Sequence, residues 1–481
     1  MHFQQLAAIS LGFPLTSVAE TVLGVYIFHR HGDRTPKSTP PANLTDLGYR
    51  EVYTSGTYYR NRYVESNATF KIAGMNSDLV KQSQISVSTS DDDVLMNSAQ
   101  GFLQGLYPPV GSSLGSETLR NGTVVESPLN GYQLIPIDTI SSGTNSESSG
   151  WLQGSTDCAK AQVSSDEYYY TDDYTNLLNS TADFYKALTP MIDGVFTDDE
   201  ISYKNAYTIF DLLNVASIHN STETFNSSLL TDNVFFELRT LADHHEWELA
   251  YNASSEIRAV AGATLAAEIL EGLNDTITGE GATKMNIQFG SYGTYFSFFG
   301  LAGLPAASPN FKGVPDYASS MVFELVTNSS TSSFPSTDDI SVRFLFHNGT
   351  ASNASEPTVY PLFGQEDTLL PWSTFADNMN NFAIGTQLEW CTACGNTTGT
   401  CSIAATSTGS SSSSNAAASS SNDHGISRAV AGVIGAMVTL AVIFGAEALI
   451  LLVGGYRLVN KKRLATAQSP PPQETTTQSK A

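Results

Sequence analysis

Short apolar runs bounded by turn residues alternate along the chain with segments whose apolar residues recur at helical spacing. Residues 22–28 form a run of β-branched and aromatic side chains, which predicts a buried strand. Residues 47–63 carry apolar side chains near helical spacing and predict a helix that packs on this strand. Further helices are expected at residues 205–216, 233–251 and 257–273. A hairpin that completes the sheet is expected at residues 321–326 with 341–347.

The two ends of the chain differ in composition from the rest. Residues 1–19 contain an apolar segment followed by small residues and are expected to form a signal peptide. Residues 403–427 are rich in Ser and predict a flexible stalk, and residues 428–455 are apolar and long enough to span a bilayer. Basic residues open the polar segment 456–481, which predicts a cytoplasmic tail. We therefore expect a single-pass type I protein of the cell membrane or secretory pathway, with residues 20–402 extracellular or luminal.

Charge and composition narrow the classes of partner. The chain of 481 residues has 23 Lys and Arg against 47 Asp and Glu, a net charge of −24. This balance argues against nucleic acid and anionic membrane surfaces as partners, and it leaves the oligomeric state open. Glycosylation sequons are expected to mark a luminal surface, and they occur at Asn43, Asn67, Asn121, Asn179, Asn220, Asn226, Asn252, Asn274, Asn328, Asn348, Asn353 and Asn396.

Four cysteines suggest cross-linking. Cys391, Cys394 and Cys401 are clustered, and Cys158 lies far upstream. Three of them could be zinc ligands, but no His is near in sequence and the setting is secretory, so disulfides are expected. The pairing stays open, although a bridge from Cys158 to the cluster would close a long loop. Adjacent histidines at 244–245 point in different directions on one helix, so we expect them to be solvated or capping rather than metal ligands.

A dense polar cluster follows the first predicted strand. Arg30 and Arg34 flank His31, and Gly32 lets the backbone approach a ligand closely. The carboxyl ends of strands are where α/β sheets bind ligands. Two guanidiniums can hold a phosphate bidentately, and an imidazole can act as a nucleophile. The alternative is a solvated turn whose arginines pair with surface carboxylates.

The cluster completes the signature R-H-G-x-R-x-P over residues 30–36, and here the chain resembles the histidine acid phosphatases. They are a branch of the phosphoglycerate-mutase-like histidine phosphatase superfamily, and the membrane-anchored fungal type is the one it resembles. The resemblance implies a three-layer α/β core, about 20–110 and 280–400, with a mainly helical cap at about 111–279. It implies that His31 is the phosphorylated nucleophile and that Arg30 and Arg34 bind the phosphoryl group. No cofactor and no metal are implied.

Four positions depart from the family pattern. Ser88 and Val94 stand where the family has arginines, the first of which binds phosphate. Ser291 and Tyr292 stand where it has a phosphate-binding His and a proton-donating Asp. A phenol is a weaker acid than a carboxyl, and a positioned acid is typically worth about 10²–10⁴-fold in rate. Asp33, within the signature, is a candidate substitute.

These observations lead to one prediction with two alternatives. The first is a membrane-anchored extracellular acid phosphatase that hydrolyses phosphomonoesters through a phosphohistidine, with reduced activity because half of the site is altered. The second is a catalytically inactive surface glycoprotein that binds phosphate or a partner. The third is a structural glycoprotein with a vestigial pocket. Phytate is a less suitable substrate, because a large polyanion needs a more basic pocket.

Overall fold

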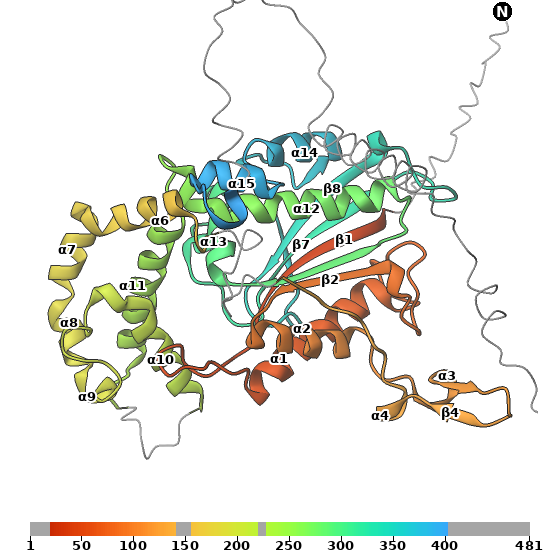
Figure 1. Ribbon diagram of the computed structural model, residues 1–481, viewed down its shortest axis with the longest axis horizontal. Helices are drawn as coiled ribbons and strands as arrows, with labels where there is room; N and C mark the ends of the chain where they lie inside the picture. Colours follow the sequence, from red (N-terminus) through yellow and green to blue (C-terminus); the bar gives the residue numbers. More distant parts are fainter. Residues whose placement is uncertain (1–19, 141–154, 220–227, 403–481) are drawn as a thin grey trace, which may run out of the picture. The chain divides into compact units, whose positions relative to one another are not determined.

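A mixed eight-stranded sheet lies at the centre of the computed structural model, which describes residues 20–140, 155–219 and 228–402 (Figure 1). Its strands are β1 (Thr21–Arg30), β2 (Ile85–Ser90), β5 (Asp138–Ile140), β6 (Met285–Gly290), β7 (Ser320–Thr327), β8 (Ile340–His347), β9 (Thr358–Tyr360) and β10 (Leu369–Pro371). The order is β10-β8-β7-β1-β6-β2-β5, with β9 paired to β8. β1, β6, β2 and β5 run parallel, and β7, β8 and β10 continue the sheet with antiparallel pairs.

β1 is the central strand, and its carboxyl end shares an edge with that of β6. Every residue from Val22 to Arg30 is buried, which suits a strand covered on both faces. The register pairs Arg30 with Gly290 of β6. The predictions of a strand at 22–28 and of the hairpin, seen as β7 and β8, are confirmed. β1 extends to Arg30, so the polar cluster begins within the strand.

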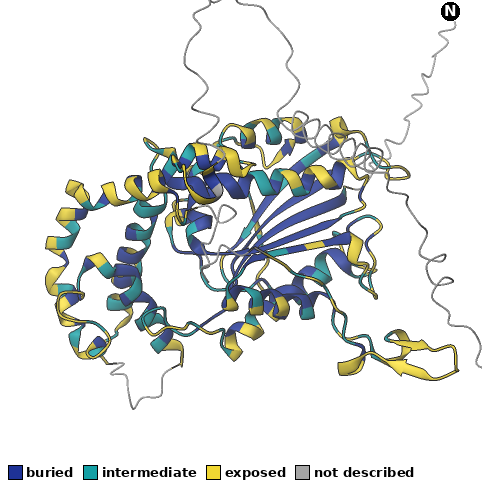
Figure 2. Cartoon of the chain, in the orientation of Figure 1, coloured by how far each residue is buried: buried dark blue, intermediate teal, exposed yellow. Residues whose placement is uncertain are grey.

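Helices cover both faces of the sheet and give three layers (Figures 1 and 2). One face packs on α1 (Asp46–Tyr59) and α2 (Asp93–Leu106), which share a core with Val25 and Ile27. The other face packs on α12 (Val260–Thr278), α13 (Tyr292–Leu301) and α14 (Trp372–Asn380), which share a core with Tyr26 and Phe28. The mixed α/β architecture implied by the sequence is therefore present.

The helix predicted over 47–63 is α1 followed by a π-helical turn, η1 (Arg60–Val64). Thr45 starts α1 as its N-cap, because its side chain accepts a hydrogen bond from the backbone N–H of Gly48. Asp92 caps α2 in the same way through the N–H of Leu95. Both helices thus begin where a side-chain oxygen replaces the missing backbone acceptor.

A group of helices between α2 and α12 lies beside the sheet (Figure 1). Its members are α6 (Ala159–Asp166), α7 (Asp172–Ser180), α8 (Ala182–Ala187), α9 (Thr189–Ile192), α10 (Ala206–His219) and α11 (Asp232–Ala250). α10, α11 and α12 confirm the helices predicted in this region. Short 3₁₀ turns occur at η2 (Gln82–Gln84), η3 (Glu167–Tyr170), η4 (Tyr203–Asn205), η5 (Glu256–Ala259), η6 (Leu304–Ala306), η7 (Pro309–Lys312), η8 (Thr337–Asp339) and η9 (Gly399–Cys401).

The range 111–279, expected to be a helical cap, also contains elements of the core. β5 joins the edge of the main sheet beside β2. α12 packs on the sheet because Leu265, Ile269 and Leu273 on one of its faces are buried in the core with Tyr26. β5 and α12 therefore pack with the sheet, although both lie within the range that the resemblance assigns to the cap.

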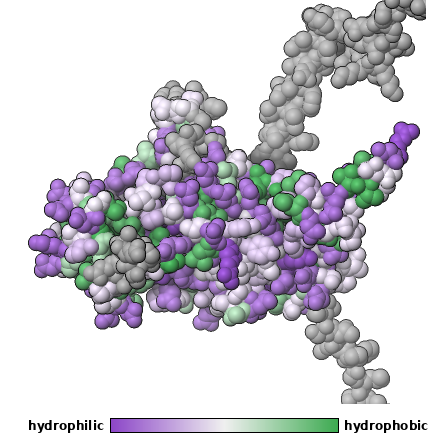
Figure 3. Space-filling model, turned by 90° about the horizontal axis from the view of Figure 1, so that it is seen from below, coloured by the Kyte–Doolittle hydropathy of each residue, from purple (hydrophilic) through white to green (hydrophobic). Residues whose placement is uncertain are grey.

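An exposed arm and a largely hydrophilic surface complete the described part of the chain. The arm consists of α3 (Gly111–Leu114), β3 (Ser116–Thr118), β4 (Val124–Glu126) and α4 (Pro128–Gly131), and it is mostly exposed (Figure 2). Figure 3 shows one face of the molecule, on which hydrophilic residues predominate and apolar patches lie between them. Such a surface fits the acidic composition of the chain.

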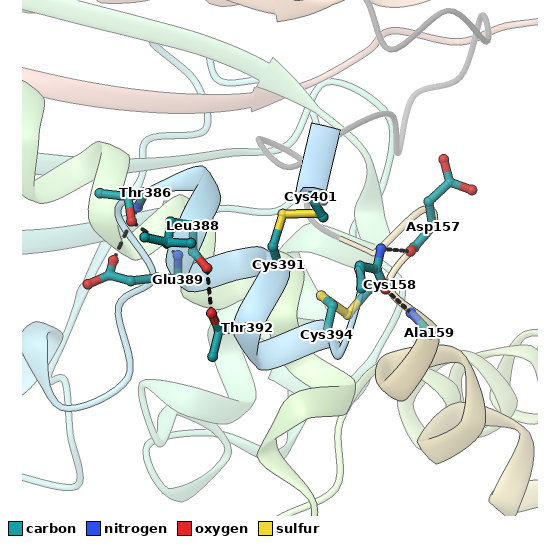
Figure 4. The surroundings of a disulfide bond; sticks show 11 residues. Asp157, Cys158, Ala159, Thr386, Leu388, Glu389, Cys391, Thr392, Cys394 and Cys401 are labelled. Atoms are coloured by element: carbon teal, nitrogen blue, oxygen red, sulfur yellow. Dashed lines mark hydrogen bonds between the residues drawn. A yellow bond between two sulfur atoms is a disulfide. The ribbon is translucent and has the colours of Figure 1, made fainter. Parts of the chain in front are cut away.

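Two disulfides lie at the end of the described chain, and one of them ties this end to the helical group (Figure 4). Cys158, which precedes α6, pairs with Cys394 of α15 (Gln387–Cys394), and Cys391 pairs with Cys401. The expectation of disulfides rather than zinc ligands is confirmed. Among the residues that the structure describes, no group of three or more His, Cys, Asp or Glu side chains could hold a metal ion.

The predicted signal peptide (1–19), stalk (403–427), membrane span (428–455) and tail (456–481) lie outside the described residues. Within the ranges 20–140, 155–219 and 228–402, no helix is both long and apolar enough to cross a bilayer. All described residues belong to one compact unit, Met1–Ser410.

Candidate active site

His31 lies directly after β1, and its side chain is fully buried. Its Nδ1 is 2.8 Å from the carbonyl oxygen of Gly32. When Nδ1 carries the proton and donates it to this carbonyl, the lone pair of the imidazole lies on Nε2. Nε2 is then the atom through which the ring can act as a nucleophile. Gly32 is required here by space, because a Cβ would lie 2.2 Å from the carbonyl oxygen of Gly48 at the start of α1.

Arg30 and Arg34 converge on the same region and are almost completely buried, with 3% and 1% exposure. Arg30 donates to the carbonyl oxygen of Pro315. The Nη2 atoms of Arg30 and Arg34 lie 3.4 and 3.5 Å from the hydroxyl of Tyr207 on α10. Their guanidinium carbons lie 4.8 and 5.7 Å from the ring centre of Tyr317. The solvated-turn alternative is therefore wrong, because both arginines are inside the protein.

Arg34 has a carboxylate partner within the protein. Asp211 of α10 accepts hydrogen bonds from both terminal nitrogens, at 2.9 and 3.1 Å, and is itself 2% exposed. The same carboxylate accepts from the backbone N–H of Lys37 at 2.8 Å and from the hydroxyl of Tyr317 at 3.3 Å. Burial works against the charge of Arg34, but Tyr207, Tyr317 and Asp211 outweigh it and raise its pKa above the usual value.

Asp33, the proposed substitute acid, is fully buried and faces the start of α1. Its Oδ2 accepts from the hydroxyl of Thr45 and lies 2.5 Å from Nε2 of His219, at the end of α10. Its backbone N–H donates to Glu51 at 2.8 Å. Burial raises the pKa of Glu51 to about 7, with a smaller contribution from the charge of Asp33. Glu51 lines a cavity of about 230 Å³ together with Arg30.

The four positions that depart from the family pattern are spread over β2, α2 and α13. Ser88 lies in β2, two residues before its carboxyl end, and pairs with Gln288. Val94 is buried in the first turn of α2. Ser291 precedes α13, and Tyr292 is its first residue, so both lie at the carboxyl end of β6 beside the cluster. The structure thus brings Ser291 and Tyr292 to the edge where Arg30, His31 and Arg34 lie.

Tyr292 is surrounded by cationic and aromatic side chains. Its ring centre is 4.5 Å from that of Tyr207, 5.4 Å from the guanidinium carbon of Arg30 and 5.2 Å from Nζ of Lys37. Its hydroxyl donates to Oε2 of Glu246 on α11 at 2.7 Å. A cavity of about 290 Å³ is lined by Lys37, Glu246 and the first residues of α13.

The histidine next to Glu246 is not solvated, contrary to the expectation for residues 244–245. His245 is 4% exposed, and its Nδ1 lies 2.9 Å from Oε1 of Glu246. His244 lies 2.8 Å from Asp173, in a partly exposed pair. The buried position of His245 follows from its ring packing against the aromatic side chains of Tyr168, Tyr169 and Tyr203.

Sequence reasoning missed the contribution of α10, α11 and the segment before β7. Tyr207 and Asp211 are four residues apart and therefore share a face of the helix predicted over 205–216. That spacing was the available signal, but it does not tell which face meets the end of β1. Tyr317 and Glu246 carried no comparable signal.

Comparisons with known proteins agree with this fold. The family model "Histidine phosphatase superfamily (branch 2)" matches residues 41–347. The chain belongs to this superfamily.

Similar proteins include acid phosphatases and a phytase. Prostatic acid phosphatase from Mus musculus is 25% identical over 347 residues, covering 68% of this chain and 82% of the relative. Lysosomal acid phosphatase from Xenopus laevis is 24% identical over 317 residues, covering 63% and 65%. The apo form of Hafnia alvei phytase matches with a TM-score of 0.52 at 13% identity, over 78% of this chain and 98% of that one. The last likeness shows the fold. The expectation of an enzyme of the acid phosphatase class is confirmed by the family and the relatives.

Proposed function

We propose that this chain is an acid phosphatase that hydrolyses phosphomonoesters through a phosphohistidine at His31. The observation that carries the proposal is the convergence of Arg30 and Arg34 beside an imidazole whose Nδ1 is held by the carbonyl of Gly32. Membership of the superfamily and likeness to acid phosphatases support it. No cofactor or metal takes part in this proposal.

In this mechanism Nε2 of His31 attacks phosphorus while the guanidiniums of Arg30 and Arg34 stabilise the charge on the phosphoryl oxygens. Fixing Nδ1 as the proton-bearing atom keeps the ring in the nucleophilic tautomer. Water then hydrolyses the phosphohistidine and releases phosphate. Activity is expected to be reduced, since Ser88 and Ser291 offer hydroxyls where the family has a guanidinium and an imidazole.

We further propose that the enzyme is anchored by the segment 428–455, with its globular part extracellular or luminal. The length of this apolar run and the basic residues after it support the proposal. The two disulfides agree with an oxidising compartment.

The test is hydrolysis of p-nitrophenyl phosphate by the purified full-length chain from pH 3 to 8, beside its His31→Ala variant. We expect turnover by the wild type and its loss in the variant, because the imidazole forms the covalent intermediate. Equal, negligible rates in both proteins would contradict an enzyme. Asp183→Asn, at an exposed position of α8, is the control and should keep the wild-type rate.

A second candidate is phosphate binding without turnover, and one observation favours it. Tyr292 stands where the resemblance implies a proton-donating Asp, and the loss of that acid slows turnover without removing Arg30 and Arg34. A phosphate-dependent rise in the unfolding temperature without hydrolysis would support this candidate against the first.

A further inference from the structure

We propose that Glu246 is the proton donor to the leaving group and that Tyr292 positions it. The inference rests on the proposed phosphatase activity. The resemblance leads one to expect a carboxylic acid at the start of α13, but that position holds Tyr292. In the structure a carboxyl reaches the same place from the cap helix α11.

The contact between the two side chains is direct. The hydroxyl of Tyr292 donates to Oε2 of Glu246 at 2.7 Å. The ring of Tyr292 packs on Tyr207 at 4.5 Å and on Phe296 at 6.2 Å, so its direction is fixed on both sides. Arg30 lies over the same ring, with its guanidinium carbon 5.4 Å from the centre. One aromatic ring therefore spans the distance between the arginine cluster and the Glu246 carboxyl.

The cavity at this place has room for a leaving group and a single acid. It has a volume of about 290 Å³ and extends along Ser291, Tyr292 and Gly293, the segment that follows β6. Among its described lining residues Glu246 is the only one with a carboxyl group, and Lys37 and Arg258 supply positive charge. An anionic ester is attracted by such a lining, and its leaving oxygen can meet Glu246.

The other carboxyls near the arginine cluster have other partners or line another cavity. Asp211 is held in an ion pair with Arg34. Asp33 is bonded to Thr45 and His219 and does not line the cavity at the start of α13, whereas Glu246, bonded to Tyr292 and His245, does. Glu51 lines the cavity of about 230 Å³ that includes Arg30 and the segment before β7, and it does not line the cavity at the start of α13. Glu246 is the carboxyl that shares a cavity with the start of α13.

In the proposed hydrolysis each proton has a named donor and acceptor. The lone pair of His31 Nε2 forms the bond to phosphorus as the bond from phosphorus to the ester oxygen breaks. The electron pair of that bond goes to the ester oxygen, which takes the proton of Glu246 and leaves as an alcohol. The Glu246 carboxylate then takes a proton from the water whose oxygen bonds to phosphorus, while the bond from phosphorus to Nε2 breaks and its electron pair returns to the imidazole. Phosphate is released, and both side chains return to their starting states.

The test compares two esters that differ in their need for an acid. β-Glycerophosphate has an alkoxide leaving group and needs a proton, whereas the p-nitrophenolate group leaves without one. We expect Glu246→Gln in the full-length chain to lower kcat/KM for β-glycerophosphate by about 10²–10⁴-fold and for p-nitrophenyl phosphate by less than about 10-fold. This parameter is chosen because it excludes the later hydrolysis of the phosphohistidine. Activity toward p-nitrophenyl phosphate also shows that the variant is folded.

Two further variants sharpen the test. Tyr292→Phe keeps the ring but removes the hydrogen bond, so it should lower activity toward β-glycerophosphate by a smaller factor with the same bias. Glu248→Gln, two residues further along α11, lines a different cavity and should leave both activities unchanged.

Two results would overturn the assignment. Equal losses on both esters in Glu246→Gln, or no loss, would refute Glu246 as the donor while leaving the phosphatase intact. A wild-type chain inert toward both esters would instead refute the proposed function, and the assignment with it. The two failures are therefore distinguishable in one experiment.

Discussion

Asp211 forms a buried ion pair with Arg34 and so places a carboxylate inside the proposed phosphate site. Both side chains are at most 2% exposed, and the carboxylate takes a hydrogen bond from each terminal nitrogen. A charge in such surroundings must be compensated, because desolvation is costly. A phosphoryl group therefore competes with Asp211 for the same donors. This competition is a physical reason to expect weak phosphate binding.

Asp211→Asn tests the competition. The substitution leaves Arg34 buried without a negative partner, so we expect a loss of about 3–5 kcal/mol in the free energy of unfolding. Inorganic phosphate should recover part of that loss and should raise the unfolding temperature of the variant more than that of the wild type. The measurement is thermal unfolding over a phosphate titration. Identical phosphate shifts in the two proteins would show that Asp211 does not compete for the site.

A second residue-scale prediction concerns pH and Glu268 of α12. Its Oε2 accepts from the side-chain amide of Gln288, whose oxygen accepts from the hydroxyl of Tyr26 at 2.5 Å. Burial raises the pKa of Glu268 from 4.5 to about 8. Between these values the unfolded carboxyl loses its proton while the folded one keeps it, so this group makes stability fall as pH rises.

Glu268→Gln removes that pH dependence. Relative to the wild type, the variant should gain on the order of 3 kcal/mol in the free energy of unfolding between pH 5 and pH 8. Urea unfolding of both proteins at the two pH values measures the difference. Other titrating groups are common to both chains and cancel. A difference that is independent of pH would mean that the folded carboxyl is ionised.

At the scale of elements, the contact between α1 and α2 depends on glycines. A Cβ on Gly56 of α1 would lie 2.0 Å from the carbonyl oxygen of Phe102, and one on Gly105 of α2 would lie 2.2 Å from that of Tyr53. The two helix backbones therefore touch directly. This contact also supports the site, because Ser98 of α2 accepts a hydrogen bond from the backbone N–H of Gly32 at 3.2 Å.

Gly56→Ala should separate the two helices. In an exposed helix this change is favourable by about 1 kcal/mol, but here we expect a loss of about 1–3 kcal/mol from overpacking. Chemical denaturation measures the change. Gln100→Ala, on the exposed side of α2, is the matched control and should stay within about 0.5 kcal/mol of the wild type. A stabilised Gly56→Ala protein would contradict the close contact.

The elements were more predictable from the sequence than their contacts. β1 contains an unbroken apolar run and α1 carries apolar residues near helical spacing, and both were predicted. β5 has only three residues, too few for any periodicity, and it was missed. Such short edge strands form because a neighbouring strand offers hydrogen bonds, which the local sequence does not record.

In the site, too, residues that are neighbours in sequence were predictable, and contacts between distant residues were not. Arg30, His31 and Arg34 are neighbours in sequence, so one motif predicts their proximity. Asp211 and Glu246 come from helices about 180 and 215 positions further along, and only tertiary packing brings Asp211 to Arg34 after β1 and Glu246 to Tyr292 after β6. Helical spacing predicts that a face exists, but tertiary contacts decide which face meets the ligand.

At the scale of the whole molecule, the proposed site is made by the sheet and the cap helices together. The arginine cluster comes from the end of β1, whereas Tyr207, Asp211 and Glu246 come from α10 and α11. The position of the helical group relative to the sheet therefore determines the site. The Cys158–Cys394 disulfide fixes one end of that group, because it joins the start of α6 to α15 (Figure 4).

The two disulfides should differ in their effect on stability. Cys158 and Cys394 are separated by 236 residues, and Cys391 and Cys401 by 10. In the chain-entropy view a bridge restricts the unfolded chain more when it closes a longer loop. We expect Cys158→Ser with Cys394→Ser to cost about 3–5 kcal/mol in the free energy of unfolding, and the other double variant about 2–3 kcal/mol.

Chemical unfolding of the two double variants, each beside the wild type, measures this difference. The long-range bridge can also hold α11 in place, because Ser165 of α6 donates a hydrogen bond to the carbonyl of Leu249 on α11. If it does, loss of this bridge should raise KM for an aryl phosphate, since α11 carries Glu246. The short-range bridge closes a loop beyond α15 and should leave KM unchanged. Equal effects of the two bridges on stability and KM would mean that the cap is held by its packing alone.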